Sequence, residues 1–198
     1  IIRSYPWRLM PYIDFAYGSI VTDRSLLSTL RDRPDEDKDG RPFQHAMSKH
    51  PSFGMNTTYV GGDAHRGAFY APSLKRWGPF YVVRQDQVAL PSRLMVFASS
   101  RAVLDNSNGQ KVPGFHRIEG PWHATPTSNS VPAFIKWLAP AKFDADKPTT
   151  TYGHLDFRHG GKAAVLTFDL HVDKLSLEQL TDMTRWSNRA TKANWQPK

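Results

Sequence analysis

The stretch Phe157–Trp186 reads FRHGGKAAVLTFDLHVDKLSLEQLTDMTRW and carries the clearest structural signal of the chain. Within it, Ala163–Phe168 is an apolar run without a charge, which predicts a strand. Turn residues flank this run, and a fully apolar strand of that kind usually lies in the middle of a sheet. We expect a sharp turn at Asp169-Leu170 and a returning segment over His171–Leu175.

A helix is predicted directly after this returning segment. Ser176 is a good N-cap residue, and Gln179 stands three positions later, as in a capping box. Apolar Leu177, Leu180 and Met183 follow behind the cap. Because the rest of the chain is rich in loops, we expect this strand, turn, strand and helix to be the scaffold on which the other segments pack.

The same stretch resembles a family signature. His159 is followed by nine residues and then Asp169, in a run R-H-G-G-x-A-x-V-L-x-F-D-x-H-V that includes His171. It resembles the H-x9-D-G segment that ends many prepilin-like proteins, the pseudopilins of type II secretion and type IV pilus systems. The family's glycine after the aspartate is Leu170 here. Asp-Gly suits a two-residue turn with positive φ and Leu does not, so the turn is longer or of another type, or this copy has drifted.

Further blocks resemble a large-headed branch of the same group and touch most of the chain. They are Tyr5–Leu9, Pro51–Asn56, Val60–Asp63, Pro91–Leu94 and a tail containing Asp182, Met183, Trp186 and Ser187. The resemblance implies a soluble pilin-like head, with an antiparallel sheet of four or more strands packed on helical segments. It also implies pilin-like subunits as partners, an exported location on the periplasmic or cell-surface face of a bacterial envelope, and membrane contact only through an N-terminal helix preceding Ile1.

Composition agrees with one folded head over residues 1–198. The chain is long enough to bury a core, and 39% apolar with 12% aromatic residues indicates a folded protein. Fifteen prolines and thirteen glycines indicate many turns and long connections, hence an α+β or mainly β fold. Loop-rich excursions are expected near residues 33–79 and 119–150. The chain has no cysteine, so disulfide and thiolate chemistry are excluded.

The net charge of +8 raises the question of an anionic partner. The positive residues are scattered along the sequence, without a tract of five or more, so the favoured interpretation is a soluble basic surface. DNA capture by a subunit at a filament tip is the alternative.

Residues 33–40, RPDEDKDG, suggest a calcium loop. Asp35, Asp37 and Asp39 alternate and are followed by a glycine, as in the first half of an EF-hand loop. A full EF-hand would need a glutamate where Ala46 stands, so a complete EF-hand is excluded. Two interpretations stay open: a shorter Ca²⁺ loop completed by other oxygen atoms, or a solvated acidic loop.

Several other elements can be predicted. The sequence indicates a helix over Asp23–Arg31, strands over Phe80–Val83 and Arg93–Ser99, and one docked turn over Phe134–Leu138. In the proline-broken segment Tyr5–Tyr17, we expect the aromatic rings to pack on the sheet. These rings are Trp7, Tyr12 and Phe15.

A catalytic pair of His159 and Asp169 is excluded by distance. The seven residues between Gly161 and Asp169 span roughly 23 Å when extended at about 3.3 Å each. A general base must lie roughly 3 Å from its partner. The motif is therefore interpreted as a strand with its two boundaries.

Three classes of function follow. The favoured one is a structural subunit, a pseudopilin-like head in a secretion or pilus-type filament that catalyses no reaction. The second is an envelope binding module for calcium, polysaccharide or DNA. The third is a hydrolase, which a deep pocket gathering His116, His123 or His154 with a carboxylate would favour.

Overall fold

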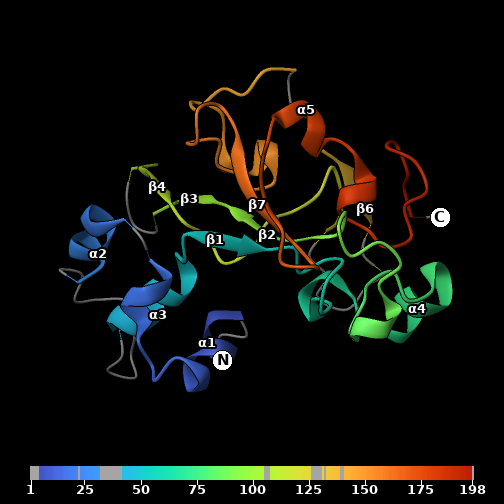
Figure 1. Ribbon diagram of the computed structural model, residues 1–198, viewed down its shortest axis with the longest axis horizontal. Coiled ribbons are helices and arrows are strands. Elements are labelled where there is room, and N and C mark those ends of the chain that lie inside the picture. Colours follow the sequence, from blue (N-terminus) through green and yellow to red (C-terminus); the bar gives the residue numbers. More distant parts are fainter. Residues whose placement is uncertain are drawn as a thin grey trace.

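The computed structural model describes residues 5–21, 23–31, 42–104, 108–125, 131, 133–138 and 141–197. In that part of the chain the helices are α1 Tyr5–Leu9, α2 Arg24–Arg31, α3 Pro42–Lys49, α4 Ala71–Trp77 and α5 Leu177–Leu180 (Figure 1). The strands are β1 Phe53–Met55, β2 Met95–Ser99, β3 Arg101–Val103, β4 Lys111–Pro113, β5 Trp122–Ala124, β6 Phe134–Lys136, β7 Ala163–Thr167 and β8 Val172–Leu175. Short 3-10 turns join many of them.

The main sheet has four antiparallel strands in the order β1-β2-β7-β8. The apolar strand predicted from the sequence is β7, and it lies between β2 and β8 as expected for a run without charges. Two smaller antiparallel pairs, β3–β4 and β5–β6, lie beside this sheet. The protein therefore has the predicted α+β fold, with a four-stranded antiparallel sheet and a short helix near the C-terminus.

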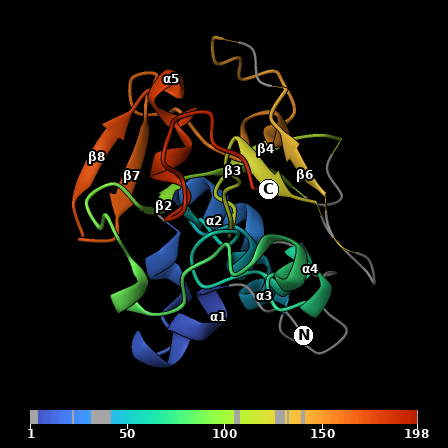
Figure 2. The same ribbon diagram turned by 90° about the vertical axis from the view of Figure 1, so that its right-hand side faces the viewer.

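The predicted hairpin and helix at the C-terminal end are confirmed. Ala163 pairs with Leu175 and Leu166 with Val172, which sets the β7–β8 register. Helix α5 begins after Ser176, whose hydroxyl accepts a hydrogen bond from Gln179 N–H (3.3 Å) while the Gln179 amide oxygen accepts from Ser176 N–H (2.9 Å). Figure 2 shows β7, β8 and α5 together on one side of the molecule, away from β6.

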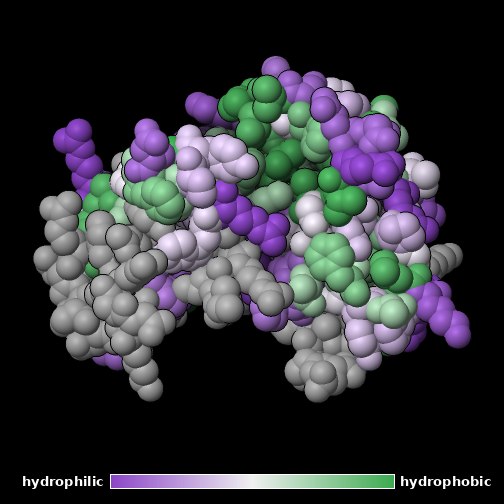
Figure 3. Space-filling model, turned by 90° about the horizontal axis from the view of Figure 1, so that it is seen from below, coloured by the Kyte–Doolittle hydropathy of each residue, from purple (hydrophilic) through white to green (hydrophobic). Residues whose placement is uncertain are grey.

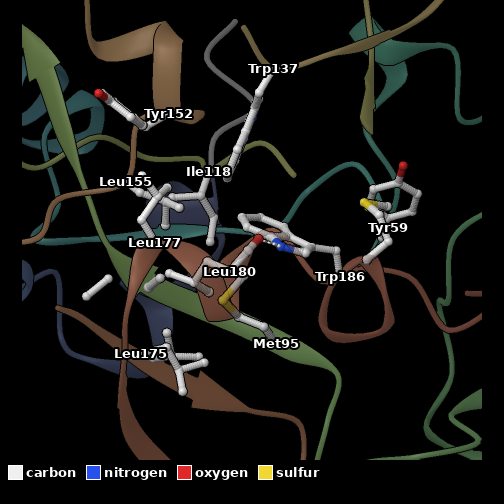
Figure 4. Close-up of a cluster of buried hydrophobic side chains, with 14 of the residues drawn as sticks. Tyr59, Met95, Ile118, Trp137, Tyr152, Leu155, Leu175, Leu177, Leu180 and Trp186 are labelled. Atoms are coloured by element: carbon white, nitrogen blue, oxygen red, sulfur yellow. Dashed lines mark hydrogen bonds between the residues drawn. The ribbon is translucent and has the colours of Figure 1, made fainter. Parts of the chain in front are cut away.

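The largest hydrophobic cluster lies between the main sheet and the C-terminal segments. Trp186 is fully buried there, and its indole N–H donates to Leu180 O at 2.9 Å (Figure 4). Strands β2, β7 and β8 contribute Met95, Val165 and Leu175 to the same cluster. Burial of this indole ties the end of α5 to the sheet, so the stretch that resembles a family tail is part of the core.

A second cluster lies under α2 and α3, on the left of Figure 1. The predicted helix over Asp23–Arg31 is α2, and Leu26 N–H donates to Asp23 Oδ1 at 3.1 Å as an N-cap contact. Leu26 and Leu30 pack there with Leu104, which directly follows β3, and with Val112, which belongs to β4. These helices therefore cover β3–β4.

Two predictions of local elements are wrong. Phe80–Val83 is not a strand: Val82 makes one isolated bridge with Val60, and Arg84 starts a 3-10 turn that takes the chain away. The apolar run instead fills an aromatic cluster, in which the Phe80 ring meets Tyr59 edge-on. Phe134–Lys136 is the strand β6 and not a docked turn, because it pairs with β5.

The aromatic rings of the N-terminal segment also differ from expectation. Trp7 packs against the second cluster, whereas Tyr12 is 84% exposed and Phe15 is 61% exposed. The chain reverses at Asp14 and Phe15, both with positive φ, and this reversal leaves the two rings in solvent. On the face of the molecule shown in Figure 3, hydrophobic and hydrophilic residues lie in several separate patches.

Candidate functional site

The two signature residues of the H-x9-D segment lie at opposite ends of β7 and each stabilises a turn. His159 N–H donates to Lys162 O at 3.1 Å, closing the turn that contains Gly160 and Gly161. At the other end, the Asp169 carboxylate accepts from the Thr167 hydroxyl (2.6 Å) and from His171 N–H (3.2 Å). The Thr167 hydroxyl, followed by that backbone N–H, lowers the pKa of Asp169. The structure does not bring these residues together into one site.

The turn after β7 has Leu170 at the position where the H-x9-D-G segment has glycine. Thr167 N–H donates to His171 O (2.9 Å) and Leu170 N–H donates to Thr167 O (3.0 Å), so three residues separate the last paired positions. Leu170 itself adopts φ 69°. This is the three-residue hairpin loop in which a residue in the left-handed region follows a turn. The turn is therefore longer than a two-residue Asp-Gly turn, and Leu170 takes the backbone conformation that glycine adopts more easily.

The chemically richest cluster lies elsewhere, around Glu119. The Arg66 guanidinium donates to Glu119 Oε1 and, through its other nitrogen, to Ala124 O at 2.8 Å. Arg117 Nε lies 3.3 Å from the same carboxylate oxygen, without hydrogen-bond geometry, and a second Arg117 nitrogen lies 4.0 Å from Asp63. Glu119 is only 4% exposed and Arg66 only 5%. A buried carboxylate held by two guanidinium groups is a satisfied ion pair.

The backbone brings these groups together from three distant segments. Ile118 N–H donates to Met55 O (2.9 Å), so residues 116–118 follow the end of β1. Glu119 N–H donates to Gly153 O (2.9 Å), which fixes the carboxylate-bearing residue beside the turn before His154. Asp63 accepts from His65 N–H (2.9 Å) and caps the 3-10 turn that carries Arg66.

Two of the histidines that the hydrolase hypothesis names, His123 and His154, interact electrostatically with this carboxylate, and His116 interacts with His154. His123 Nε2 lies 3.7 Å from Glu119 Oε2, and His123 Nδ1 donates to Gly120 O at 3.0 Å, since a carbonyl oxygen can only accept. Burial lowers the pKa of His123 despite the opposing charge of Glu119. Burial, together with the charge of Arg117, lowers the pKa of His116 and of His154 to about 4.

The geometry of this cluster is that of a packed interior. The His154 ring stacks on Phe115 with centroids 4.1 Å apart, and the Arg117 guanidinium lies 5.6 Å from the centroid of the same ring. Two surface depressions of the described residues, of ≈410 Å³ and ≈370 Å³, are lined by other residues. The cluster therefore links segments by charge, and it offers no exposed base or nucleophile. Sequence reasoning named these histidines but missed the carboxylate; the spacing of Glu119 and His123, four residues apart, is the signal that could have found it.

The expected metal residues Asp35, Asp37 and Asp39 lie outside the described residues. In the part of the chain that the structure describes, no three His, Asp or Glu side chains gather in a way that could hold a metal ion. His45, His50 and His65 do not form a cluster there either. His50 Nδ1, for example, donates to Gly114 O at 3.2 Å.

A shallow groove is the remaining candidate. A depression of ≈410 Å³ is lined by the C-terminal segment, and one of ≈370 Å³ lies between that segment and the β5–β6 pair. The two depressions share Asn194, and we treat them together as one groove. In both ribbon views the C-terminal end lies near β6 (Figures 1 and 2). Its lining combines tryptophan, lysine and amide side chains, which the sequence distributes over residues 121 to 196.

Comparisons with known proteins assign no family: no family model, no curated protein and no solved structure matches this chain. Among the described helices, none has the length and apolar character needed to cross a membrane.

Proposed function

We propose that this chain is the head of a structural subunit, pseudopilin-like or minor-pilin-like, in a secretion or pilus-type filament of the cell envelope, and that it catalyses no reaction. Its partners are other pilin-like subunits, and its place is the periplasmic or cell-surface side of the envelope. The proposal begins from the resemblance of residues 157–186 to the H-x9-D-G segment.

One observation carries the proposal. The segment with the family signature is the central strand of the main sheet, and both signature residues stabilise turns at its ends. A motif used in this way supports a scaffold, because the backbone N–H of His159 and the carboxylate of Asp169 already have backbone or hydroxyl partners. The buried Glu119 cluster agrees with the same interpretation, since its carboxylate is ion-paired with Arg66 and Arg117.

Cysteine cross-linking tests this proposal directly. Because the sequence contains no cysteine, a cysteine introduced by substitution is the single thiol of this chain. Strand β8 is an edge strand of the main sheet, and Val172 and Lys174 on it are exposed. Single substitutions Val172→Cys, Lys174→Cys and Leu138→Cys, made in the gene in its own host, allow cross-linking of intact cells with a bismaleimide. A subunit in a filament should give a cross-linked dimer from at least one position, since each subunit then carries one thiol, and the dimer should appear in the sheared surface fraction.

Two controls make the result decisive. The cysteine-free parent protein must give no cross-linked dimer under the same treatment, and deletion of the host's prepilin peptidase should abolish the dimer at every position. Monomer alone at all three positions, with the protein absent from sheared filaments, would remove the filament proposal.

A further inference from the structure

The groove beside β6 is held open by contacts of the C-terminal segment. Met183 N–H donates to Ala193 O (2.9 Å), and Trp195 N–H donates to Lys192 O (3.0 Å). The Arg189 guanidinium donates to Trp77 O, and the Trp195 ring meets Tyr59 edge-on with centroids 6.4 Å apart. These contacts define a groove in the folded chain between residues that the sequence separates by about 60 positions.

The groove is positively charged. Lys136, Arg189 and Lys192 line it, and none of its described lining residues is acidic. The ammonium groups of Lys136 and Lys192 are exposed and make no ion pair or hydrogen bond within the described residues. Three of the 26 lysines and arginines therefore line the groove without an acidic lining residue, which favours an anionic ligand.

The remaining lining groups suit a sugar. Trp122 and Trp195 are partly exposed and offer apolar ring surface, on which the C–H face of a sugar ring can pack. The amides of Asn194 and Gln196 have no partner among the described residues, and an amide can both donate to and accept from hydroxyl groups. Ammonium groups beside them can form charge-assisted hydrogen bonds with a carboxylate or sulfate substituent.

Nucleic acid fits this groove less well. Binding of single strands by stacking uses a row of aromatic faces open to successive bases. Here Trp137 is 7% exposed, and Trp122 and Trp195 pack against the main core cluster. The partly exposed surfaces of Trp122 and Trp195 are enough for one or two sugar residues, so the groove matches a short segment of an acidic glycan.

From these observations we propose that the groove between β6 and the C-terminal segment binds an anionic polysaccharide, through Lys136, Lys192 and Asn194 with Trp122 and Trp195 as the apolar floor. This inference does not depend on the filament role, since a groove of this chemistry would bind the glycan in any assembly.

Affinity electrophoresis of the 198-residue protein in gels containing a polymer tests the proposal. The polymers are polygalacturonate, dextran sulfate and neutral dextran, with a single-stranded oligonucleotide as competitor. Polygalacturonate or dextran sulfate should retard the protein, and the retardation should weaken as the salt concentration is raised. Comparison of the two polymers identifies carboxylate or sulfate as the preferred group. Neutral dextran should not retard it.

Matched variants locate the site. The double substitution Lys136→Gln, Lys192→Gln should weaken binding by at least about tenfold, and Asn194→Ala by about fivefold. The control Lys162→Gln, Lys174→Gln removes the same charge from the exposed surface of the β7–β8 hairpin and should change affinity less than about twofold.

Three outcomes would overturn the proposal. Equal weakening by the control pair would mean attraction by overall charge alone. If neutral dextran retarded the protein as much as the acidic polymers do, the ligand would not be anionic. If the oligonucleotide displaced the protein at a lower concentration than free acidic glycan does, the groove would be a nucleic-acid site. The substituted side chains are exposed, so thermal unfolding of each variant should match that of the parent and folding defects should not obscure the result.

Discussion

Leu170 shows at the scale of one residue how this chain departs from an ideal hairpin. Its φ of 69° places a bulky side chain in the left-handed region, where the Cβ atom approaches backbone atoms and costs roughly 1–2 kcal/mol. The side chain is 77% exposed, so packing offers little compensation. The register of β7 and β8 and the hydrogen bonds of Asp169 hold the residue there.

Replacing Leu170 with glycine should therefore stabilise the protein. The expected gain is about 1 kcal/mol in the free energy of unfolding, because glycine adopts this φ without strain, although it also increases the entropy of the unfolded chain. Urea unfolding measures the change. Leu170→Ala is the control: it keeps the positive φ and should leave stability within about 0.5 kcal/mol of the parent. A loss of stability in Leu170→Gly would contradict this account of the turn.

Gly153 is the second position at which the backbone conformation favours glycine. It has φ 58°, and a Cβ atom built there would collide with the carbonyl oxygen of Glu119. We expect Gly153→Ala to cost more than about 3 kcal/mol, from strain together with displacement of the segment that carries Glu119. Gly160→Ala is the matched control, since Gly160 also has positive φ but has open space around it, and it should cost only about 1 kcal/mol. Equal losses would show that the contact with Glu119 is unimportant.

At the scale of elements, the C-terminal hairpin and helix form a unit specified by short-range signals. The turn after β7 is stabilised by the Asp169 carboxylate, and α5 begins with the reciprocal bonds of Ser176 and Gln179. Leu177 and Leu180 are buried on the other side of that short helix. Local capping and burial act together here, which is why this unit could be predicted.

Removing the cap should have a measurable and specific cost. Ser176→Ala should lower the free energy of unfolding by about 1 kcal/mol, because Gln179 N–H loses its acceptor. Ser176→Asp should preserve most of the stability, since aspartate is also a good N-cap residue. Chemical denaturation of the three proteins measures the difference. Equal stability of Ser176→Ala and the parent would mean that burial of Trp186 alone holds α5.

At the scale of the whole molecule, the buried charges around Glu119 connect segments that are far apart in the sequence. Arg66, Glu119 and His154 come from three connections, and each is held by backbone hydrogen bonds of its own. A buried ion pair contributes little net stability when intact, but loss of one partner leaves an unpaired charge in the interior.

Substitution of one partner should show this asymmetry. Arg66→Met leaves Glu119 with the more distant Arg117, and we expect a loss of about 3–5 kcal/mol. The double substitution Arg66→Met, Glu119→Leu removes both charges and should recover part of the loss. Thermal unfolding of the single and double variants compares them. A double variant that is less stable than Arg66→Met would contradict the assignment of the loss to an unpaired carboxylate.

The buried histidines predict how stability depends on pH. His116 and His154 have folded-state pKa values lowered to about 4, whereas an unfolded histidine titrates near about 6.5. Between these values the unfolded state binds protons that the folded state does not, so stability is full above about pH 6.5 and is lost as the pH falls toward 4.

Each of the two histidines should contribute about 1.4 kcal/mol per pH unit in that window. Urea unfolding between pH 7 and pH 5 measures the slope, in a range where exposed carboxylates stay ionised. His154→Gln removes one titrating ring and should reduce the slope by roughly half of the contribution from this pair. A free energy of unfolding that does not change between pH 7 and pH 5 would contradict burial of both rings.

Tertiary contacts explain where sequence reasoning failed. Phe80–Val83 has the apolar character of a strand, but the Phe80 ring packs edge-on against Tyr59 and Phe134. Aromatic packing of this kind does not require the hydrogen-bond ladder of a strand. Phe134–Leu138 is predicted as a docked turn within a proline-rich excursion, but its first three residues pair with Trp122–Ala124, a strand from the other side of that proline-rich loop. Tyr12 and Phe15 are exposed through a chain reversal that composition does not reveal.

The sequence by itself determined the α+β class, the central position of Ala163–Thr167 and the capped helix that follows it, because apolar runs, turn residues and caps act over a few positions. Only the tertiary structure decided the neighbours of each element, the gathering of Arg66, Glu119 and His154 in the interior, and the groove shared by Lys136 and Lys192. Contacts of that kind form between residues tens of positions apart, and their existence depends on how the backbone closes and on which charges it buries together. No local pattern encodes that closure.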